Sequence, residues 1–288
     1  MSPQVSEKMI FGFNMFTQIR DMLYKKTGIF ISNNKIYALK KRVEKRVESL
    51  GLPSPKEYIE YLKYMDSSGR EFANLVNEIT VNETYFFRNF PQLQAFAEHC
   101  LPEVVERKKK QKIHTVNVLS AGSSTGEEPY TLSIICQEML DPSFRCKIDA
   151  LDIDSKALEA AQKAVYSKRS VKDVPLKYLE KYFVKKGEVY QLKDSVKKDV
   201  HFYRVNLFDR EALLSIGKNY DFVFCRNVLI YFSDESRRKV VESFYVMMNP
   251  GGYIFLGHSE SISRITTAFE LKRIGGHLVY QKPLSARG

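Results

Sequence analysis

Residues 116–130 read VNVLSAGSSTGEEPY, and this stretch decides the fold of the larger part of the chain. Residues 116–119 form a short apolar run with β-branched side chains, which is typical of a buried parallel strand. The small residues at 121–126 cannot form a helix interior. Glu127, Glu128 and Pro129 then open an amphipathic helix, because carboxylates and proline are favoured in a first helical turn. Strand, glycine turn and helix present backbone groups to a small ligand.

Strand and helix patterns alternate along the chain from residue 113. We expect strands at 115–119, 147–151, 202–205, 221–225, 253–256 and 278–281, and helices at 129–139, 155–165, 211–215 and 236–248. This alternation predicts a parallel sheet with helices on both faces, in a domain that spans 113–284. A lysine-rich excursion after residue 165 contains GEVYQL and KKDVHFYRV. These two segments predict a small inserted antiparallel β-subdomain at about 182–202.

Residues 12–78 predict a separate all-helical domain. A first helix covers residues 15–26 and ends before Gly28, and a second runs from a cap at Ser32 or Asn33 to Gly51. Two further helices follow before residue 79. In the second helix, apolar residues recur at steps of three and four and form one stripe for burial.

The other faces of that second helix carry a dense group of basic side chains, among them Lys35, Arg42, Lys45 and Arg46. Such a cluster is often only a solvated helix face. Within a chain that is basic overall, it also fits a docking surface for an acidic helix or a phosphate backbone.

Composition and charge limit the classes of function. The chain has 288 residues, of which 44% are hydrophobic, and this is ample for a packed core. Its 45 basic against 34 acidic residues give a net charge of +11, which suits nucleic acid, an acidic membrane surface or an acidic protein. No apolar run approaches a membrane span. The four scattered cysteines show no zinc or disulfide spacing, so we expect a reduced, cytoplasmic protein.

Residues 79–112 form a linker and lead-in to the sheet domain, with NETYFFR at 82–88. Polar Asn82, Thr84 and Arg88 are interleaved with aromatic residues. A linker pinned to a core would explain the aromatics, but a partly buried arginine calls for a carboxylate that a ligand can supply. The basic run RKKKQK at 107–112 we expect to be a solvated loop.

Ligands of parallel α/β sheets lie beyond the carboxyl ends of the strands. After the first strand, Gly122 and its neighbours allow close backbone approach, but the spacing is neither a Walker loop nor GxGxxG. After the second strand, Asp152 stands where a carboxylate accepts both ribose hydroxyls of a nucleoside. Asp154 we expect to cap the next helix. A glycine turn followed by such an aspartate predicts a nucleoside site.

The third and fourth strands end in further polar residues. Asn206 and Leu207 are placed to read and cover an adenine edge, although an ordinary turn is the favoured interpretation when this motif is taken alone. Asn227 and Tyr231 follow the fourth strand and are able to hold a polar substrate group without adding charge. His258 follows the fifth strand, and we assign it no role, since a lone loop histidine is more often structural.

Taken together, these motifs resemble the chemotaxis receptor glutamate O-methyltransferases, the CheR family. The matching stretches are NETYFFR (82–88), LSAGSSTGEEPYTL (119–132), ALDIDSKALEAA (150–161), VNLFD (205–209), FCRNVLIYF (224–232) and GGYIFLGHSES (251–261). The basic helix followed by SLGL also resembles the family's N-terminal helical domain. The resemblance implies a Rossmann-like class I methyltransferase sheet, with an N-terminal all-helical domain and a small inserted antiparallel β-subdomain.

The resemblance also implies S-adenosylmethionine as cofactor, S-adenosylhomocysteine as product, no metal, and receptor glutamates as acceptors. Carried over by position, the cofactor contacts are Asn82, Thr84, Arg88, Gly122, Glu128 (with Glu127 as second choice), Asp152, Asn206, Leu207, Asn227 and Val228. Arg88 and Tyr231 match positions around the acceptor carboxylate.

The partners that the resemblance implies are the cytoplasmic helices of methyl-accepting receptors, which the basic helix would dock through Lys35, Arg42, Lys45 and Arg46. No nucleic acid and no membrane insertion are expected. Because the turn around Gly187 looks short, we expect an enzyme that does not use a receptor pentapeptide tether. Two alternatives stay open: a methyltransferase acting on nucleic acid, and a non-catalytic adaptor that keeps the cofactor site.

Overall fold

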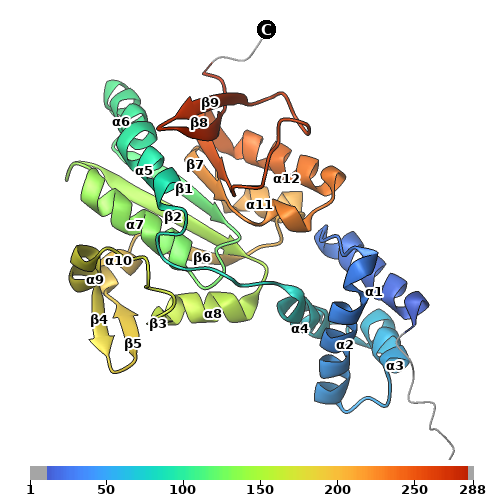
Figure 1. Cartoon of the computed structure of the whole chain (residues 1–288). Helices are drawn as coiled ribbons and strands as arrows, with labels where there is room; N and C mark the ends of the chain where they lie inside the picture. Colours follow the sequence, from blue (N-terminus) through green and yellow to red (C-terminus); the bar gives the residue numbers. More distant parts are fainter. Residues whose placement is uncertain (1–11, 285–288) are drawn as a thin grey trace, which may run out of the picture. The chain divides into compact units, whose positions relative to one another are not determined.

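The computed structural model describes residues 12–284, which fall into two units (Figure 1). One is a helical unit that comprises the described chain up to Val81 together with Tyr231–Ser233. The other, which we call the sheet unit, comprises Asn82–Ile230 and the described chain from Asp234 onwards. Within residues 12–284, no helix has both the length and the apolar character that a membrane crossing needs.

The helical unit is built around the apolar stripe that its sequence predicts. Its helices are α1 (Phe13–Thr27), α2 (Ile36–Leu50), α3 (Pro55–Glu60) and α4 (Arg70–Ile79). Leu39, Val43 and Val47 of α2 are buried. Helices α1 and α2 end before Gly28 and Gly51, as predicted. The start of α2 differs, because a 3-10 turn over Asn33–Lys35 precedes it and Ser32 makes no side-chain cap.

The sheet unit contains a seven-stranded sheet whose bounds are β1 (Thr115–Ala121), β2 (Arg145–Asp152), β6 (Val200–Arg204), β7 (Tyr220–Cys225), β8 (Met248–Leu256), β9 (Glu270–Ile274) and β10 (His277–Gln281). The strand order is β6-β2-β1-β7-β8-β10-β9. Strands β6 to β8 in this order are parallel, whereas β10 runs antiparallel to both β8 and β9. Neither β9 nor this antiparallel edge was predicted from the sequence. The order reverses between β1 and β7, which is where α/β sheets bind ligands.

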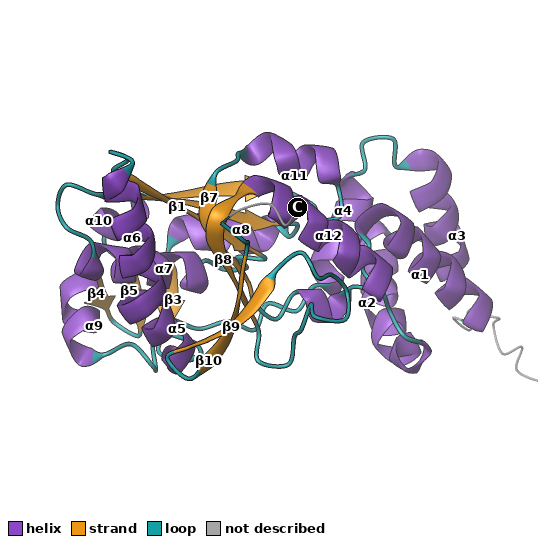
Figure 2. Ribbon diagram, turned by 90° about the horizontal axis from the view of Figure 1, so that it is seen from above, coloured by secondary structure: helices purple, strands orange, loops and turns teal. Residues whose placement is uncertain are grey.

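Helices cover both faces of this sheet, as predicted (Figures 1 and 2). The bounds are α5 (Phe90–Ala95), α6 (Leu101–Lys110), α7 (Glu127–Met139), α8 (Ser155–Lys163), α11 (Arg210–Ile216) and α12 (Asp234–Met247). Phe96, between α5 and α6, packs edge-on against Phe222, Phe224 and Phe255 of the central strands, with ring centroids 4.9 to 5.9 Å apart. Helices α11 and α12 lie on the opposite face.

The small β-subdomain differs from its predicted bounds. It is an antiparallel sheet of order β3-β5-β4, formed by β3 (Val165–Ser167), β4 (Phe183–Lys186) and β5 (Val189–Leu192), and the short helices α9 (Leu176–Tyr182) and α10 (Asp194–Lys197) flank it. The segment KKDVHFYRV does not belong to it, because β6 pairs in parallel with β2 in the main sheet. The sequence pattern of a strand does not show which strand it pairs with. Here β6 pairs with the edge of β2 that β1 leaves open.

Two helices are more deeply buried than the sequence predicts. Helix α7 was expected to be amphipathic, yet its residues from Pro129 to Cys136 are all buried, because the sheet lies on one side and α10 and the Phe96 turn lie on others. The basic run at 107–112 is largely the end of α6 and not a solvated loop. Lys108 is only 5% exposed, and its Nζ lies 2.8 Å from Asp221 Oδ2.

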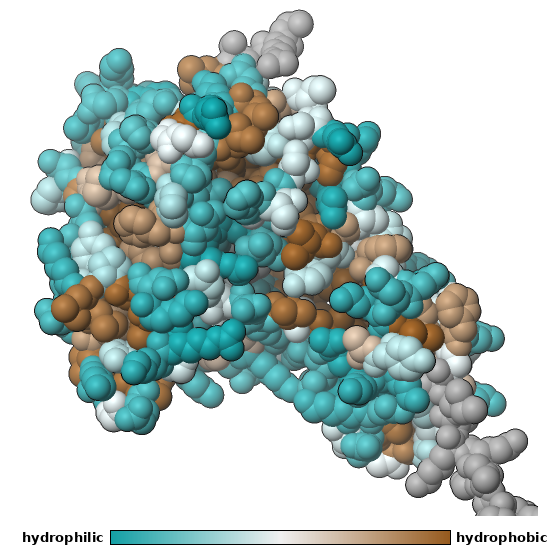
Figure 3. Space-filling model, in the orientation of Figure 1, coloured by the Kyte–Doolittle hydropathy of each residue, from teal (hydrophilic) through white to brown (hydrophobic). Residues whose placement is uncertain are grey.

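Apolar side chains are mostly used inside the two units. The face shown in Figure 3 is largely hydrophilic, and hydrophobic residues gather on it only in small groups. No large apolar surface is therefore seen on this face. The strand ends carry polar residues.

Candidate functional site

The turn between β1 and α7 folds back over the end of β2. The backbone N–H groups of Gly122 and Ser123 both donate to the Leu151 carbonyl oxygen at 2.8 Å. Gly122 has a φ of 82°, and a Cβ at this position would lie 2.3 Å from Cγ2 of Val228. Only glycine fits here, because any side chain would collide with the loop after β7. The turn thus brings together the ends of β1, β2 and β7.

Ser123 within this turn carries an orphaned hydroxyl. The side chain is 1% exposed, and its Oγ has no hydrogen-bond partner in the structure of residues 12–284. A buried polar group without a partner costs about 1–3 kcal/mol. The glycine turn and the orphaned hydroxyl therefore fit a polar ligand seated on this turn.

Asp152 lies at the end of β2, beside the same turn. One carboxylate oxygen accepts the Ser124 N–H at 2.7 Å, and the other accepts the Asp154 N–H at 2.8 Å. Burial raises the pKa of the Asp152 carboxyl, and these hydrogen bonds oppose the rise. Each oxygen keeps a second lone pair, so the carboxylate can hold the turn and still accept a ligand hydroxyl. Asp152 therefore acts as a turn aspartate, the alternative that its sequence position also allows, and this task leaves room for a ligand.

Asn82 connects the lead-in segment to both strand ends. Its amide nitrogen donates to Asp154 Oδ2 at 2.7 Å, and its amide oxygen accepts the Ser124 hydroxyl at 2.9 Å. The other Asp154 oxygen caps helix α8, as predicted. Thr84 lies half-buried two residues further along. The lead-in segment is thus anchored against the glycine turn through Asn82.

The two glutamates that open α7 differ in burial and partners. Glu127 is 2% exposed, its Oε2 accepts the Thr125 hydroxyl at 2.6 Å, and burial raises the pKa of its carboxyl. Glu128 is half-buried, and its Oε1 accepts the Ser120 hydroxyl of β1 at 2.8 Å. Glu128 is therefore the glutamate of the pair whose carboxylate is joined to a strand end.

The backbone around Arg88 is strained. Phe87 and Asn89 both have left-handed φ angles, of 58° and 60°. Such a conformation costs of order 1–3 kcal/mol and persists only where surrounding contacts enforce it. Here the Phe87 N–H donates to Thr131 Oγ1 of α7 at 3.1 Å, and the Phe87 ring stacks on Tyr178 at 5.8 Å between centroids. The surrounding contacts thus hold Arg88 in a defined turn.

The Arg88 side chain folds back on its own segment. Its Nη1 donates to the Glu83 carbonyl at 2.8 Å, and its guanidinium carbon lies 5.7 Å from the Tyr85 ring centroid. None of these partners is a carboxylate. The Arg88 guanidinium is therefore able to pair with a carboxylate from outside this segment.

Glu260 fixes the loop after β7. Its carboxylate accepts the N–H groups of Asn227 at 2.7 Å, Gly257 at 2.6 Å and Ile230 at 3.2 Å. Asn227 has a left-handed φ of 60°, which leaves its N–H pointing at Glu260. The predicted site residues Asn227 and Val228 are thereby held at the centre of the strand ends.

Asn206 and Leu207 follow β6, at the far side of β2. The Asn206 Oδ1 accepts the Phe208 N–H at 3.1 Å, so the side chain shapes its own turn. Leu207 is 7% exposed. The structure shows a turn here, with Leu207 packed in it, and the adenine contact of these two residues stays a prediction.

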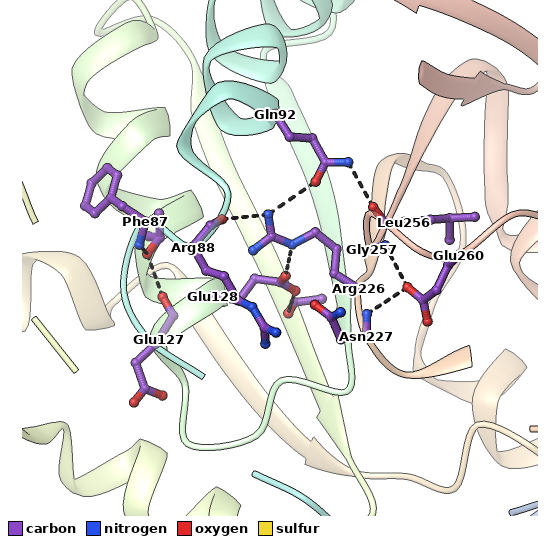
Figure 4. Close-up of polar contacts among 12 residues, drawn as sticks. Phe87, Arg88, Gln92, Glu127, Glu128, Arg226, Asn227, Leu256, Gly257 and Glu260 are labelled. Carbon is purple, nitrogen blue, oxygen red and sulfur yellow. Dashed lines mark hydrogen bonds and ion pairs between the residues drawn. The ribbon is translucent and has the colours of Figure 1, made fainter. Parts of the chain in front are cut away.

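Arg226 lies at the centre of that network, as Figure 4 shows. Its Nε donates to Glu128 Oε2 at 2.7 Å, and its Nη1 donates to the Arg88 carbonyl at 2.9 Å and to Gln92 Oε1 at 3.2 Å. Gln92 in turn donates to the Leu256 carbonyl at 2.9 Å. The Arg226 side chain is 5% exposed. One guanidinium therefore joins the start of α7, the Arg88 turn and the end of β8.

Tyr231 belongs to the helical unit. Its carbonyl accepts the Phe30 N–H at 2.8 Å, and the next residue, Phe232, forms an isolated antiparallel bridge with Ile29. The Tyr231 side chain is 36% exposed. Tyr231 follows Ile230, the last residue of the sheet unit in this segment.

The basic helix α2 uses part of its charge inside the helical unit. Arg46 forms a buried pair with Glu71, at 2.8 Å for Nε and 2.7 Å for Nη2. Arg42 donates to the Glu78 carbonyl at 2.6 Å. Lys45 lies 2.7 Å from Glu78 Oε2 but remains 63% exposed, and Lys35 is exposed. Arg46 therefore also has a structural task, and the docking of a receptor through these four residues stays a prediction.

Sequence reasoning missed Arg226 and Gln92 and assigned no role to Glu260. Arg226 lies in the quoted stretch FCRNVLIYF, directly before Asn227. The only signal was an arginine at the end of an otherwise apolar strand, which requires an anionic partner when buried. Its partner Glu128 lies 98 residues earlier, so the pairing is visible only in the fold.

Comparison with known proteins agrees with this geometry. Residues 82–275 match the family "CheR methyltransferase, SAM binding domain", and residues 14–80 match "CheR methyltransferase, all-alpha domain". Chemotaxis protein methyltransferase 2 of Vibrio cholerae serotype O1 is 41% identical, over 93% of this chain and 92% of its own. The chemotaxis protein methyltransferase of Borreliella burgdorferi is 31% identical, over 84% and 86%. That of Escherichia coli K12 is 28% identical, over 96% and 93%.

The two matched domains together cover most of the chain, and their order is the one seen in the structure. The sheet order, the glycine turn and the strand-end carboxylates fit a nucleoside-containing cofactor at the carboxyl ends of the strands. The chain therefore belongs to the CheR methyltransferase family and is an S-adenosylmethionine-dependent protein-glutamate O-methyltransferase.

Proposed function

We propose that this enzyme methylates glutamate side chains in the cytoplasmic helices of methyl-accepting chemotaxis receptors. The observation that carries the proposal is the Arg226 network, in which one guanidinium lies 2.7 Å from Glu128 and 2.9 Å from the carbonyl of Arg88. This arrangement joins a carboxylate suited to the cofactor with an arginine suited to an acidic acceptor.

Residues of the sheet unit divide into two groups in this proposal. Those that would hold S-adenosylmethionine are Asn82, Thr84, Gly122, Glu128, Asp152, Asn206, Leu207, Asn227 and Val228, with Ser123 as an added hydrogen-bonding group. When bound, the cofactor supplies a methyl group already activated by its positive sulfur. Arg88 would contact this region and orient the incoming carboxylate, and Tyr231 would fix the second carboxylate oxygen.

The reaction asks little acid–base chemistry of these residues. A glutamate carboxylate is already ionised at neutral pH, so no strong general base has to activate it. What remains is alignment of the reacting atoms at about 3 Å, which supplies most of the acceleration. Arg88 held by Tyr85 and the Glu83 carbonyl suits this task, because it can orient a carboxylate without a competing carboxylate partner.

The helical unit would dock the acidic receptor helices through Lys35 in the turn before α2 and through Arg42, Lys45 and Arg46 of α2. Lys45 is 63% exposed although paired, which supports this part of the proposal. The turn between β4 and β5 contains only Gly187 and Glu188. So short a turn supports an enzyme that works without a pentapeptide tether. Such a substrate places the enzyme in the cytoplasm.

A transfer assay tests the proposed substrate. The full-length enzyme is incubated with methyl-labelled S-adenosylmethionine and either receptor-containing membranes or total RNA, and methylated receptor peptides are identified by mass spectrometry. We expect label on receptor glutamates and none on RNA. Label on RNA alone would establish the nucleic-acid alternative, and cofactor binding without any transfer would establish the adaptor alternative.

A further inference from the structure

We propose that Arg226 is a positioning residue. It couples Glu128, whose carboxylate would bind the cofactor, to the strained turn that carries Arg88. The inference rests on the proposed function in two points only, namely that Arg88 contacts the acceptor carboxylate and that Glu128 contacts the cofactor. The coupling itself is a property of the described contacts (Figure 4).

The guanidinium divides its donors between two elements. Its Nε bonds Glu128 at the first turn of α7, and its Nη1 bonds the Arg88 carbonyl in the lead-in turn. A bidentate pair would place both nitrogens on one carboxylate, as arginine usually does. Arg226 instead spans two segments, which lysine with its single ammonium nitrogen cannot do in the same way.

The turn that receives Nη1 needs such support. Phe87 and Asn89 on either side of Arg88 have left-handed backbones, which relax unless contacts enforce them. Thr131 holds one side of the turn through the Phe87 N–H. On the other side the Asn89 carbonyl accepts the Gln92 N–H at 3.0 Å, and Arg226 holds the Arg88 carbonyl itself. Loss of the Nη1 contact therefore removes the side-chain hydrogen bond that fixes the Arg88 carbonyl.

Gln92 makes Arg226 itself rigid. Its amide oxygen accepts from Nη1 at 3.2 Å while its amide nitrogen donates to the Leu256 carbonyl at 2.9 Å. Gln92 is 5% exposed, so these contacts are shielded from water. Through Arg226 and Gln92, the Arg88 turn is therefore linked by hydrogen bonds to the end of β8 as well as to α7.

The test uses Arg226→Lys in the full-length enzyme, because lysine retains a positive charge for Glu128. We expect kcat toward a receptor cytoplasmic fragment to fall about tenfold to a hundredfold, since a small displacement of an orienting group has effects of that order. The dissociation constant of S-adenosylhomocysteine, measured by calorimetry, should change less than about threefold, because the Glu128 contact survives. Arg238→Lys on the exposed face of α12 is the matched control.

A double-variant cycle separates positioning from a general structural role. If Arg226 acts through Arg88, Arg226→Lys should add less than about threefold to the loss already caused by Arg88→Ala. Multiplication of the two losses would overturn the proposal. So would a cofactor affinity that falls by the same factor as kcat, because Arg226 would then serve the cofactor alone.

Gln92→Leu provides a second route if Arg226→Lys does not fold. It removes the amide that fixes Nη1 and leaves both charges of the ion pair in place, so we expect a smaller fall in kcat with unchanged cofactor affinity. Full activity of Gln92→Leu in that case would overturn the proposal.

Hydrogen exchange of peptides covering residues 85–90 gives a readout that needs no acceptor. Arg226→Lys or Gln92→Leu should speed exchange of the Phe87 amide relative to Arg238→Lys. Unchanged exchange would overturn the coupling whatever the substrate is. If wild-type enzyme transfers no methyl group to receptors yet exchange changes as expected, the substrate proposal fails and the coupling stands.

Discussion

Two buried arginine–glutamate pairs, one in each unit, use the same chemistry for opposite purposes. In the helical unit, Arg46 gives both Nε and Nη2 to Glu71, at 2.8 and 2.7 Å. Tyr58 and Asn74 donate to the same carboxylate at 2.8 and 3.2 Å. Every donor converges on one acceptor group, and the cluster is complete within itself.

The pair in the sheet unit is open by comparison. Arg226 gives only Nε to Glu128, and its Nη1 leaves the pair for the Arg88 carbonyl and Gln92. A closed pair stabilises the elements that carry it. An open pair also transmits the position of one element to another, and we infer that burial and distance alone do not distinguish these two uses.

The largest expected effect tests the closed pair. Glu71→Ala should cost about 3–5 kcal/mol of unfolding free energy, because it leaves the Arg46 charge buried without a partner. Denaturant unfolding of the full chain, followed by helical circular dichroism, measures this cost. Glu44→Ala is the control, since the Lys40–Glu44 pair is exposed and should matter by about 0.5 kcal/mol or less. A strong loss of S-adenosylhomocysteine affinity in Glu71→Ala would contradict the separation of the two pairs.

The open pair should respond in function more than in stability. Glu128→Gln keeps an oxygen acceptor for Arg226 but removes the negative charge, so we expect S-adenosylhomocysteine to bind about tenfold more weakly, or about 1.4 kcal/mol. Isothermal titration calorimetry provides the measurement. Glu159→Gln on the exposed face of α8 should bind normally. Undiminished affinity in Glu128→Gln would mean that Glu127 is the cofactor contact.

Lowering the pH should change the stability contributions of Glu71 in the helical unit and Glu127 in the sheet unit in opposite directions. Burial alone would raise the pKa of Glu71, but the hydrogen bonds from Arg46, Asn74 and Tyr58 outweigh it and the pKa is lowered. A lowered folded-state pKa contributes stability above the unfolded value of about 4.3, and that contribution is lost as the pH falls through the folded value. The unfolding free energy of Glu71→Gln should therefore differ most from that of the wild type at neutral pH, and the two values should converge in acid.

Glu127 in the sheet unit should show the reverse trend. Burial raises the pKa of its carboxyl, so its contribution is present below about pH 4.3 and is lost as the pH rises through the folded value. Glu127→Gln should gain stability on wild type as the pH increases toward 7. Thermal unfolding of both variants at several pH values tests the pair of trends, and parallel curves for the two would refute them.

The smallest expected effect concerns the exposed charges Lys35 and Lys45 of the basic helix and the turn before it. Lys35→Glu with Lys45→Glu should lower receptor methylation about threefold at low ionic strength, with the difference fading in salt. Lys56→Glu on the exposed part of α3 makes half of this charge change on another helix and should leave methylation unchanged. An equal loss of cofactor affinity in the double variant would exclude docking as the cause.

Local sequence signals predicted the parts of the fold that depend on neighbouring residues. Gly122, with its positive φ, and the cap formed by Asp154 were both visible as patterns. The apolar stripe of α2 predicted its buried face for the same reason. These features need only the chemistry of a few adjacent residues.

Features that depend on distant partners were not predictable in this way. Lys108 looked like part of a solvated run until Asp221, 113 positions later, supplied its partner. The pairing of β6 with β2 is likewise set by a free strand edge. The role of Arg226 needed both Glu128 and the strained turn at Arg88. The candidate site was therefore predicted as a set of residues, and its internal connections were not.

The three residues Tyr231–Ser233 have a practical consequence for dissecting the protein. They lie in the middle of the sheet unit's sequence, yet the Phe30 N–H and the bridge from Ile29 tie them to the helical unit. A gene fragment that starts at Asn82 would deprive the Tyr231 carbonyl of Phe30 and Phe232 of its bridge to Ile29. The two domains are consequently poor modules for exchange between relatives, and a functional chimaera would have to carry residues 231–233 together with the helical half.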